Sequence, residues 1–324
     1  MLRMTWLVLL AAAALQSVPD RATAQTYPNG TIKILVGFPP GGTTDIIARD
    51  VGQELEKAWH QTVIVENRAG ANGAIAAAQL AKLPPDGQTL MMIVSGHITN
   101  PLVSPSAGYD AIKDFTAISL LASSPLLIFA HPSFAANDIK GAIALAKEKP
   151  GTYNFGSSGP GSSLHLFAEM FNSIEGIKLV HIPYRGDAPM ITALISNDIQ
   201  LAFLPQANGI ANVQSNLIRG LGVTGTKRME AIPNVPTAQE QGIKGLEVGS
   251  WVALFAPAGT PPDIVQAIQR HLADALSDPK VREWLISTGQ NPVGNPPAEF
   301  SAQFKADIER FAKVIDQAKI PKLD

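Results

Sequence analysis

Residues Thr31–Asp45 read TIKILVGFPPGGTTD and join an apolar segment to a turn and to the start of a helix. The apolar segment Ile32–Phe38 predicts a strand that is buried on both faces. Pro39 and Pro40 prevent further pairing in a sheet, because proline has no backbone N–H to donate. Gly41 and Gly42 then allow a tight turn. The stretch therefore predicts a strand, a glycine turn and a helix in succession.

The helix after this turn is expected to begin at Thr43 or Thr44, either of which can cap it. Its apolar positions are Ile47, Val51, Leu55 and Ala58, which keep helical spacing. The first N–H groups of a helix have no partner within it, and the positive end of the helix dipole lies behind them. We therefore expect free backbone N–H groups here that can bind an anion.

The composition of the loop narrows its chemistry. Residues 37–45 contain no Lys, Arg, Cys or His, and they match neither the phosphate-loop motif nor the dinucleotide-binding motif. A site without a fixed cation suits a carboxylate that must be released again. The alternative is a tight turn that binds nothing.

Length and charge exclude some classes of protein. The chain has 324 residues, of which 46% are hydrophobic and 16% charged, and its net charge is −2. This size favours two domains. The absence of a basic cluster argues against nucleic acid as a partner.

The first 24 residues are expected to be a signal peptide. Arg3 supplies the positive start, Trp6–Leu15 the apolar centre, and Ala22-Thr23-Ala24 the cleavage site after Ala24. Ten apolar residues are too few to span a bilayer. The signal peptide predicts an exported protein, most simply one in a bacterial periplasm. The chain has no cysteine, so it cannot carry a lipid on an N-terminal Cys, and we expect it to be soluble. We also expect a monomer.

The opening pattern recurs in the middle of the chain. Tyr153–Phe155 predicts a strand, Gly156–Gly161 a glycine loop, Ser162 a helix cap, and the following apolar positions a helix. Strands that alternate with helices indicate an α/β fold with parallel-rich sheets flanked by helices, which bind ligands at the carboxyl ends of their strands. Two apolar runs, Ile118–Ala130 and Val248–Ala256, are suited to cross between domains. We therefore expect a two-lobed clamshell.

Seven ordered motifs carry a resemblance to a known family. They are Phe38–Asp45, Val65–Arg68, Pro85–Leu90, Phe155–Gly159, His181–Gly186, Asn234–Thr237 and Phe255–Pro261. The chain resembles the receptors of tripartite tricarboxylate transporters, the Bug-type periplasmic binding proteins. Departures from the usual pattern include Ala69, Asn72, Gln88 and Arg185, and they bear on ligand identity more than on class.

The resemblance implies a type II periplasmic binding protein fold, without catalysis and without a cofactor or metal. We place lobe 1 at residues 25–124 plus 250–324 and lobe 2 at residues 125–249. The family captures small carboxylates, namely di- and tricarboxylates, acidic amino acids or aromatic acids. Many members deliver them to the large and small membrane subunits of a permease, and both glycine loops grip one ligand carboxylate.

The candidate ligand-binding residues follow the ends of predicted strands. They are Phe38, Pro40, Gly41, Gly42, Thr43, Thr44, Asp45, His97, Gly156, Ser157, Ser158, Ser162, His165, Tyr184, Arg185, Gly186, Asp187 and Pro205. Asp45 would repel a bound carboxylate, so we expect it to cap the helix in preference to orienting loop amides or a water. His97 is expected to make a polar contact and His165 either to reach the cleft or to pack, whereas His181 fits a satisfied strand histidine.

Two other functions remain open at this point. A sensory receptor would use the same clamshell to signal a bound carboxylate to a membrane kinase. An exported serine hydrolase is disfavoured, because the Gly-x-Ser-x-Gly pattern fails at Pro160.

Overall fold

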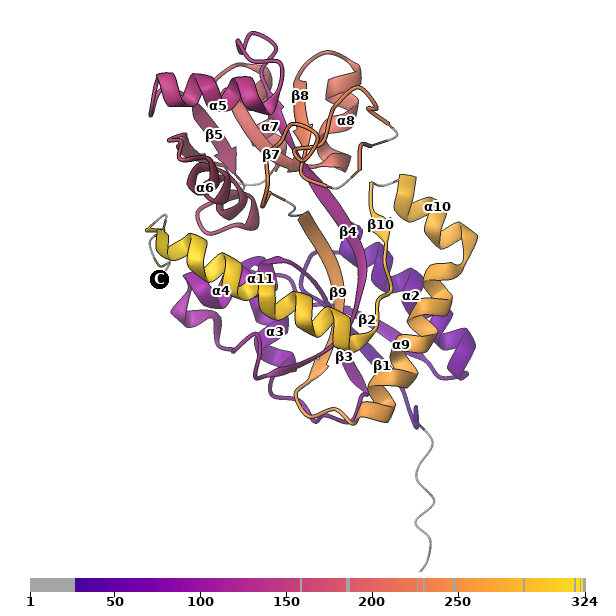
Figure 1. The fold of residues 1–324 in the computed structure, drawn as a ribbon. Helices are drawn as coiled ribbons and strands as arrows, with labels where there is room; N and C mark the ends of the chain where they lie inside the picture. Colours follow the sequence, from indigo (N-terminus) through magenta and orange to yellow (C-terminus); the bar gives the residue numbers. More distant parts are fainter. Residues whose placement is uncertain are drawn as a thin grey trace, which may run out of the picture.

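Two sheets share one long strand in the computed structural model (Figure 1). The structure describes residues 27–157, 159–184, 187–225, 227–229, 231–246, 249–287, 289–317, 319–320 and 322. The expected signal peptide, residues 1–24, lies outside them, as do Ser158, Arg185 and Gly186.

The elements alternate along the chain much as the sequence predicts. The strands are β1 (Ile32–Val36), β2 (Val63–Asn67), β3 (Thr89–Val94), β4 (Phe115–Ala130), β5 (Asn154–Ser157), β6 (Val180–Pro183), β7 (Leu201–Pro205), β8 (Arg219–Val223), β9 (Gly249–Pro257) and β10 (Asn291–Pro292). The helices are α2 (Thr43–Trp59), α3 (Ala74–Leu80), α4 (Gly96–Val103), α5 (Ile139–Glu148), α6 (Ser163–Glu175), α7 (Asp187–Ile195), α8 (Gln206–Gln214), α9 (Pro262–Ser277), α10 (Pro279–Ser287) and α11 (Pro297–Gln317), with short 3₁₀ turns at Ala71–Gly73 and Pro105–Ala107.

The two sheets have matching strand orders. The first sheet runs β2-β1-β3-β9-β4 and the second runs β6-β5-β7-β4, with β8 also paired to β4. Within each sheet the three leading strands are parallel. The pairs that involve β4, and the pair of β9 with β3, are antiparallel. The parallel-rich prediction thus holds for each outer part, and the shared centre is antiparallel.

The strand β4 passes from one sheet to the other at Pro125. Residues up to Pro125 pair with β9 in the first sheet, and residues from Leu126 pair with β7 in the second. The run Ile118–Ala130 therefore crosses as expected, and β9 begins beside the crossing at Gly249. The exact division into lobes stays a prediction.

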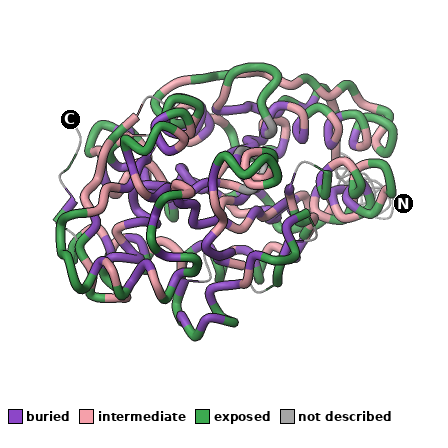
Figure 2. The backbone as a smooth tube through the Cα atoms, turned by 90° about the horizontal axis from the view of Figure 1, so that it is seen from above, coloured by how far each residue is buried: buried purple, intermediate pink, exposed green. Residues whose placement is uncertain are grey.

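Alternate residues of β1 enter two separate hydrophobic clusters. Ile34 and Val36 pack with α2 and α9 on one face. Leu35 packs with α3 and α4 on the other. This explains why the strand is a continuous apolar run rather than an alternating one. Figure 2 shows buried segments running through the inside of the molecule with exposed ones around them.

The C-terminal helix α11 contacts elements of both halves of the molecule. Its Phe304 ring lies 5.1 Å from Phe255 of β9, and Phe311 lies 5.4 Å from Phe167 of α6. Ser173 of α6 also donates a hydrogen bond to Gln317 at 3.0 Å. The helix thus bridges the two halves beside the strands that connect them (Figure 1). None of the described helices has the length and apolar character needed to cross a membrane.

Candidate functional site

The first glycine loop joins β1 to α2, as the sequence predicts. Gly41 has a φ of +85°, a conformation that favours glycine. The helix is capped by Gly42 and not by Thr43 or Thr44, and no side chain bonds to the cap position. The first N–H groups of a helix have no partner within the helix, so this end of α2 suits an anion.

The Asp45 carboxylate holds this loop in place through hydrogen bonds. Its Oδ2 accepts the Gly41 N–H at 2.9 Å, and Arg49 donates to both of its oxygens. Asn67, at the end of β2, donates to Asp45 at 2.9 Å and to the Phe38 carbonyl at 3.0 Å. The hydrogen bond from Gly41 agrees with the prediction that Asp45 orients a loop amide, whereas the cap position of α2 is occupied by Gly42 and not by Asp45. The expectation that the Gly41 amide is free is wrong, since the carboxylate already holds it.

The sequence reasoning did not single out Arg49 and Asn67 as parts of the site. The i, i+4 spacing of Asp45 and Arg49 on a helix was the available signal. Hydrogen bonding to Arg49 is the main cause that lowers the Asp45 pKa to about 2, even though burial opposes it. The carboxylate therefore stays charged and keeps the loop fixed at neutral pH.

Removing this carboxylate tests its role. Asp45→Ala should lower the free energy of unfolding by about 2 kcal/mol, because the hydrogen bonds from Gly41, Arg49 and Asn67 to a buried, charged carboxylate are lost. Asp45 contributes above its ordinary pKa of 3.8, and the contribution is lost as the pH falls toward 2. Urea unfolding at pH 7 measures the change. Glu66→Ala, in an exposed pair with Arg68, should change stability by less than about 1 kcal/mol; equal losses would argue against the role of Asp45.

A second loop lies directly against the first. Gly73 follows β2, and its Cα would be only 2.8 Å from a Cβ added at Gly37. Ala71 and Asn72 both have positive φ values, of 46° and 51°. Asn72 is held by Asn100 of α4, whose side chain donates to the Asn72 carbonyl at 3.0 Å. The carboxyl ends of β1, β2 and β3 thus meet at one compact edge.

The second glycine loop follows β5 in the position that β1 has in the first sheet. Gly156 lies inside the sheet, where a Cβ would come within 2.6 Å of Ile199 and 2.7 Å of Met190. Ser157 is 0% exposed. These two residues support the loop from the core, so neither is open to a ligand in this structure. The expectation of direct contact is therefore not met at Gly156 and Ser157.

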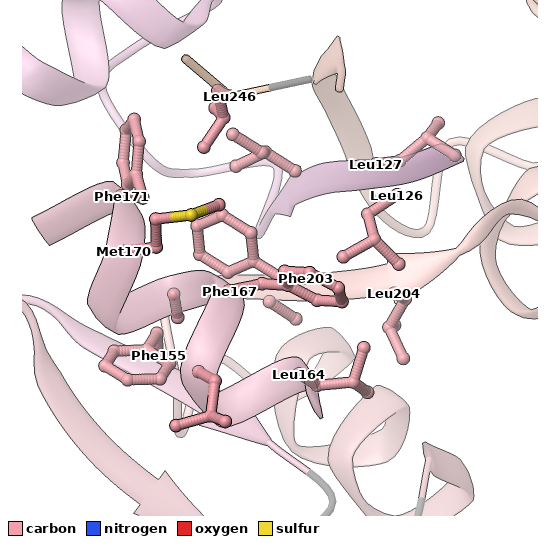
Figure 3. Packing of buried hydrophobic residues seen from close by; sticks show 14 of the residues in the cluster. Leu126, Leu127, Phe155, Leu164, Phe167, Met170, Phe171, Phe203, Leu204 and Leu246 are labelled. Atoms are coloured by element: carbon pink, nitrogen blue, oxygen red, sulfur yellow. The ribbon is translucent and has the colours of Figure 1, made fainter. Parts of the chain in front are cut away.

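The amides of this loop are also partly occupied. Gly159 N–H donates to Ser157 Oγ at 3.1 Å, and Gly161 N–H donates to His165 Nδ1 at 3.0 Å. Ser162 caps α6 as expected by accepting from His165 N–H at 3.3 Å. Apolar side chains of α6, including Phe167 and Phe171, pack onto the second sheet behind the loop (Figure 3). The loop is consequently mounted on a firmly packed helix.

Three further candidates lie near the same edge of the second sheet. Tyr184, after β6, donates its backbone N–H to the Ser157 carbonyl at 2.9 Å. Asp187 begins α7, and Pro205 ends β7 opposite Leu126. The structure thus brings Ser157, Ser162, His165 and Tyr184 together. That this group and the first loop share one cleft stays a prediction.

His97 does not make the polar contact expected of it. The ring is 0% exposed and is packed among Tyr109, Phe115, Phe255 and Phe304. Neither ring nitrogen has a hydrogen-bond partner among the described residues. Burial lowers the pKa of His97 to about 3, so the ring is a neutral part of the core.

The segment after β3 forms the helix α4, which contains a proline. Its Pro101 has no N–H to donate to the His97 carbonyl four residues earlier. The hydroxyl of Tyr109 donates to that carbonyl instead, at 3.1 Å. A contact from outside the helix thereby compensates for the proline, which a local reading of the sequence did not reveal.

Among the described residues, no group of three His, Asp or Glu side chains is placed to hold a metal ion. A helix begins directly after each glycine loop, α2 after the first and α6 after the second. Helix starts favour anions through their N–H groups and the helix dipole.

Comparisons with known proteins agree with this geometry. Residues 47–320 match the family described as Tripartite tricarboxylate transporter family receptor. Protein BugT of Bordetella pertussis is 32% identical over 298 residues, which cover 90% of each chain. The solved structure of R. palustris Rpa4515 with adipate is 32% identical, has a TM-score of 0.76, and is matched over 92% of this chain and 100% of that one. MatC from Rhodopseudomonas palustris with bound malate is 29% identical, with a TM-score of 0.72, and is matched over 89% of this chain and 100% of that one.

Proposed function

The chain belongs to the family of tripartite tricarboxylate transporter receptors, the Bug-type periplasmic solute-binding proteins with a two-lobed fold, and from this premise we propose that it captures a small carboxylate between its lobes. The ligand classes are di- and tricarboxylates, acidic amino acids and aromatic acids. Closure of the lobes around the ligand would produce the form that a membrane permease recognises. The proposal includes export to the periplasm with cleavage after Ala24.

One observation carries the proposal. A glycine-rich loop that opens a helix follows β1 in the first sheet, and another follows β5 at the equivalent place in the second. Each presents a helix start, where anions are favoured. Relatives with bound adipate and bound malate support a dicarboxylate as the first ligand to try.

The test is calorimetric titration of the mature protein with malate, succinate, adipate, citrate, glutamate and benzoate, with glucose as a neutral comparison. We expect saturable binding of at least one carboxylate and none of glucose. Binding of glucose without any carboxylate would overturn the proposal. Uptake measured in a strain lacking the gene, compared with induction of transport genes, separates delivery to a permease from sensing.

Gly42→Ala tests whether the ligand approaches the first loop closely. At Gly42 the backbone is extended, with φ −78° and ψ 164°. An added Cβ would meet only the Pro39 carbonyl, at 3.7 Å. Because alanine is a poorer N-cap residue than glycine, we expect a loss of stability of at most about 1 kcal/mol. We expect the affinity to be about tenfold weaker, because the methyl group occupies the space of the ligand.

Gly30→Ala is the matched control for this variant. It precedes β1 at the opposite end of the strand, and an added Cβ would meet only the side chain of Gln88, at 3.9 Å. It should change neither stability nor affinity. Wild-type affinity in Gly42→Ala would show that the ligand does not contact the loop at this residue.

A further inference from the structure

Two histidine rings lie face to face beside the second glycine loop. His165 is in the first turn of α6 and His181 is on β6, and their ring centroids are 3.8 Å apart with planes only 14° from parallel. Phe155 of β5 stacks on His181 at 5.1 Å. Aromatic stacking thus fixes the two imidazoles as one unit.

Each ring contacts the polar framework of the loop. His165 Nδ1 accepts the Gly161 N–H at 3.0 Å. His181 Nε2 lies 2.6 Å from Ser157 Oγ, and the same Oγ accepts the Gly159 N–H at 3.1 Å. One loop amide is therefore held by a histidine directly, and a second is held through Ser157.

These contacts add to the hydrogen bonds within the loop, in which Ser157 Oγ and Ser162 N–H both donate to the Gly159 carbonyl. Gly159 and Gly161 have φ values of +127° and +70°, and α6 starts immediately after them. Glycines in such conformations have many alternatives open to them in the absence of tertiary contacts. His165 supplies an acceptor for one loop amide directly, and His181 contacts the Ser157 hydroxyl that accepts from the other, so both contacts favour this conformation.

The arrangement requires a neutral ring at His165. Its Nδ1 accepts a hydrogen bond, which an imidazolium cannot do. Protonation of His165 would put a hydrogen on Nδ1, directly opposite the Gly161 N–H. It would also place a positive charge against the stacked ring of His181. The titratable groups that face His165 are His181 and Glu169, whose Oε1 lies 3.8 Å from Nε2. Burial, and secondarily the charge of His181, lower the pKa of His165 to about 4.

We infer that His165, in its neutral form, and His181 are positioning residues that hold the second glycine loop in the conformation that receives the ligand. The inference rests on the proposed function for the identity of the ligand. The state of the loop itself can be measured without any ligand. The two parts can therefore fail separately.

The decisive variants are His165→Leu and His165→Asn. Leucine removes the acceptor, whereas the asparagine Oδ1 can replace Nδ1 as an acceptor and does not titrate. The readouts are hydrogen exchange of the Gly161 amide in ligand-free protein, and the affinity for malate and adipate at neutral pH. We expect His165→Leu to speed the exchange and weaken the affinity, each by about tenfold or more, and His165→Asn to stay within about threefold of the wild type.

A pH series gives a second test that does not depend on the leucine variant folding. As the pH falls from 7 to 4, wild-type Gly161 should lose protection while His165→Asn keeps it. Glu169→Gln is the charge control and should leave exchange at pH 7 unchanged. Wild-type protection and affinity in His165→Leu, or equal loss in His165→Asn and His165→Leu, would overturn the inference. If Gly161 responds as expected but no carboxylate binds the wild type, the positioning role stands and the proposed function falls.

Discussion

His97→Leu should flatten the dependence of stability on pH between about 6.5 and 3. In the folded protein this histidine is fully buried and its pKa is lowered to about 3, whereas the ordinary value is 6.5. Within that window the unfolded chain binds a proton that the folded chain does not. The free energy of unfolding therefore falls with decreasing pH by up to about 1.4 kcal/mol for each pH unit.

The surroundings of the His97 ring explain why its pKa is lowered. A charged imidazole among Tyr109, Phe115, Phe255 and Phe304 would have neither water nor a hydrogen-bond acceptor among the described residues. Burial disfavours the charged form, so titration of His97 leaves stability unchanged above about pH 6.5 and lowers it as the pH falls below that value. Leucine has a similar size and no group to titrate.

The measurement is urea unfolding of both proteins at a series of pH values from 7.5 to 4. Tyr109→Phe is the matched control in the same cluster. It removes the hydroxyl that donates to the His97 carbonyl, so it should lower stability at every pH without changing the slope. If His97→Leu has the same slope as the wild type, another group accounts for the acid sensitivity.

The local architecture of the first loop could be predicted because each step has a local cause. The apolar run of β1, the two prolines, the two glycines and the spaced apolar residues of α2 each specify one feature, and the structure contains them in that order. Ser162 was predicted as a cap for the same reason, since its hydroxyl bonds three residues along the same chain. The crossing role of β4 was visible as an apolar run too long for an ordinary strand.

The state of the loop amides could not be predicted in this way. Whether the Gly41 amide is free depends on the rotamer of Asp45, which in turn is held by Asn67 from another strand. Likewise, the position of His97 depends on Phe255 and Phe304, which follow it by more than 150 residues in the printed sequence. Local patterns identify which residues lie near a site, and tertiary contacts decide which of their polar groups remain available.

The two sheets place their glycine loops at equivalent positions. In both, the strand with the glycine loop stands second in the order, between two parallel neighbours. In each sheet a helix begins directly after this glycine loop, α2 in the first and α6 in the second. Under the proposed function both loops hold one ligand, and enclosing it requires the two halves to move toward each other. The connection between the halves is therefore as important as the loops.

The backbone at Gly249 is closely packed against that connection. β9 begins there, directly opposite Pro125, where β4 leaves the first sheet. An added Cβ would lie 2.5 Å from the Ser124 carbonyl oxygen and 3.4 Å from the Pro125 Cα. Both are backbone atoms, which cannot rotate out of the way. A methyl group must consequently push the two strands apart.

Gly249→Ala should therefore lower the free energy of unfolding by about 2–3 kcal/mol and also change carboxylate binding, because the altered strand separation changes how the halves meet. Urea unfolding, calorimetric titration and small-angle scattering with and without ligand measure these effects. Ser250→Ala, at the adjoining position opposite Ser124, adds no bulk and should behave like the wild type. A Gly249→Ala protein with normal stability would mean that the strands separate easily at this point. Normal affinity and normal compaction on binding, despite reduced stability, would mean that the halves close by bending elsewhere, with the α11 contacts to α6 as the next place to examine.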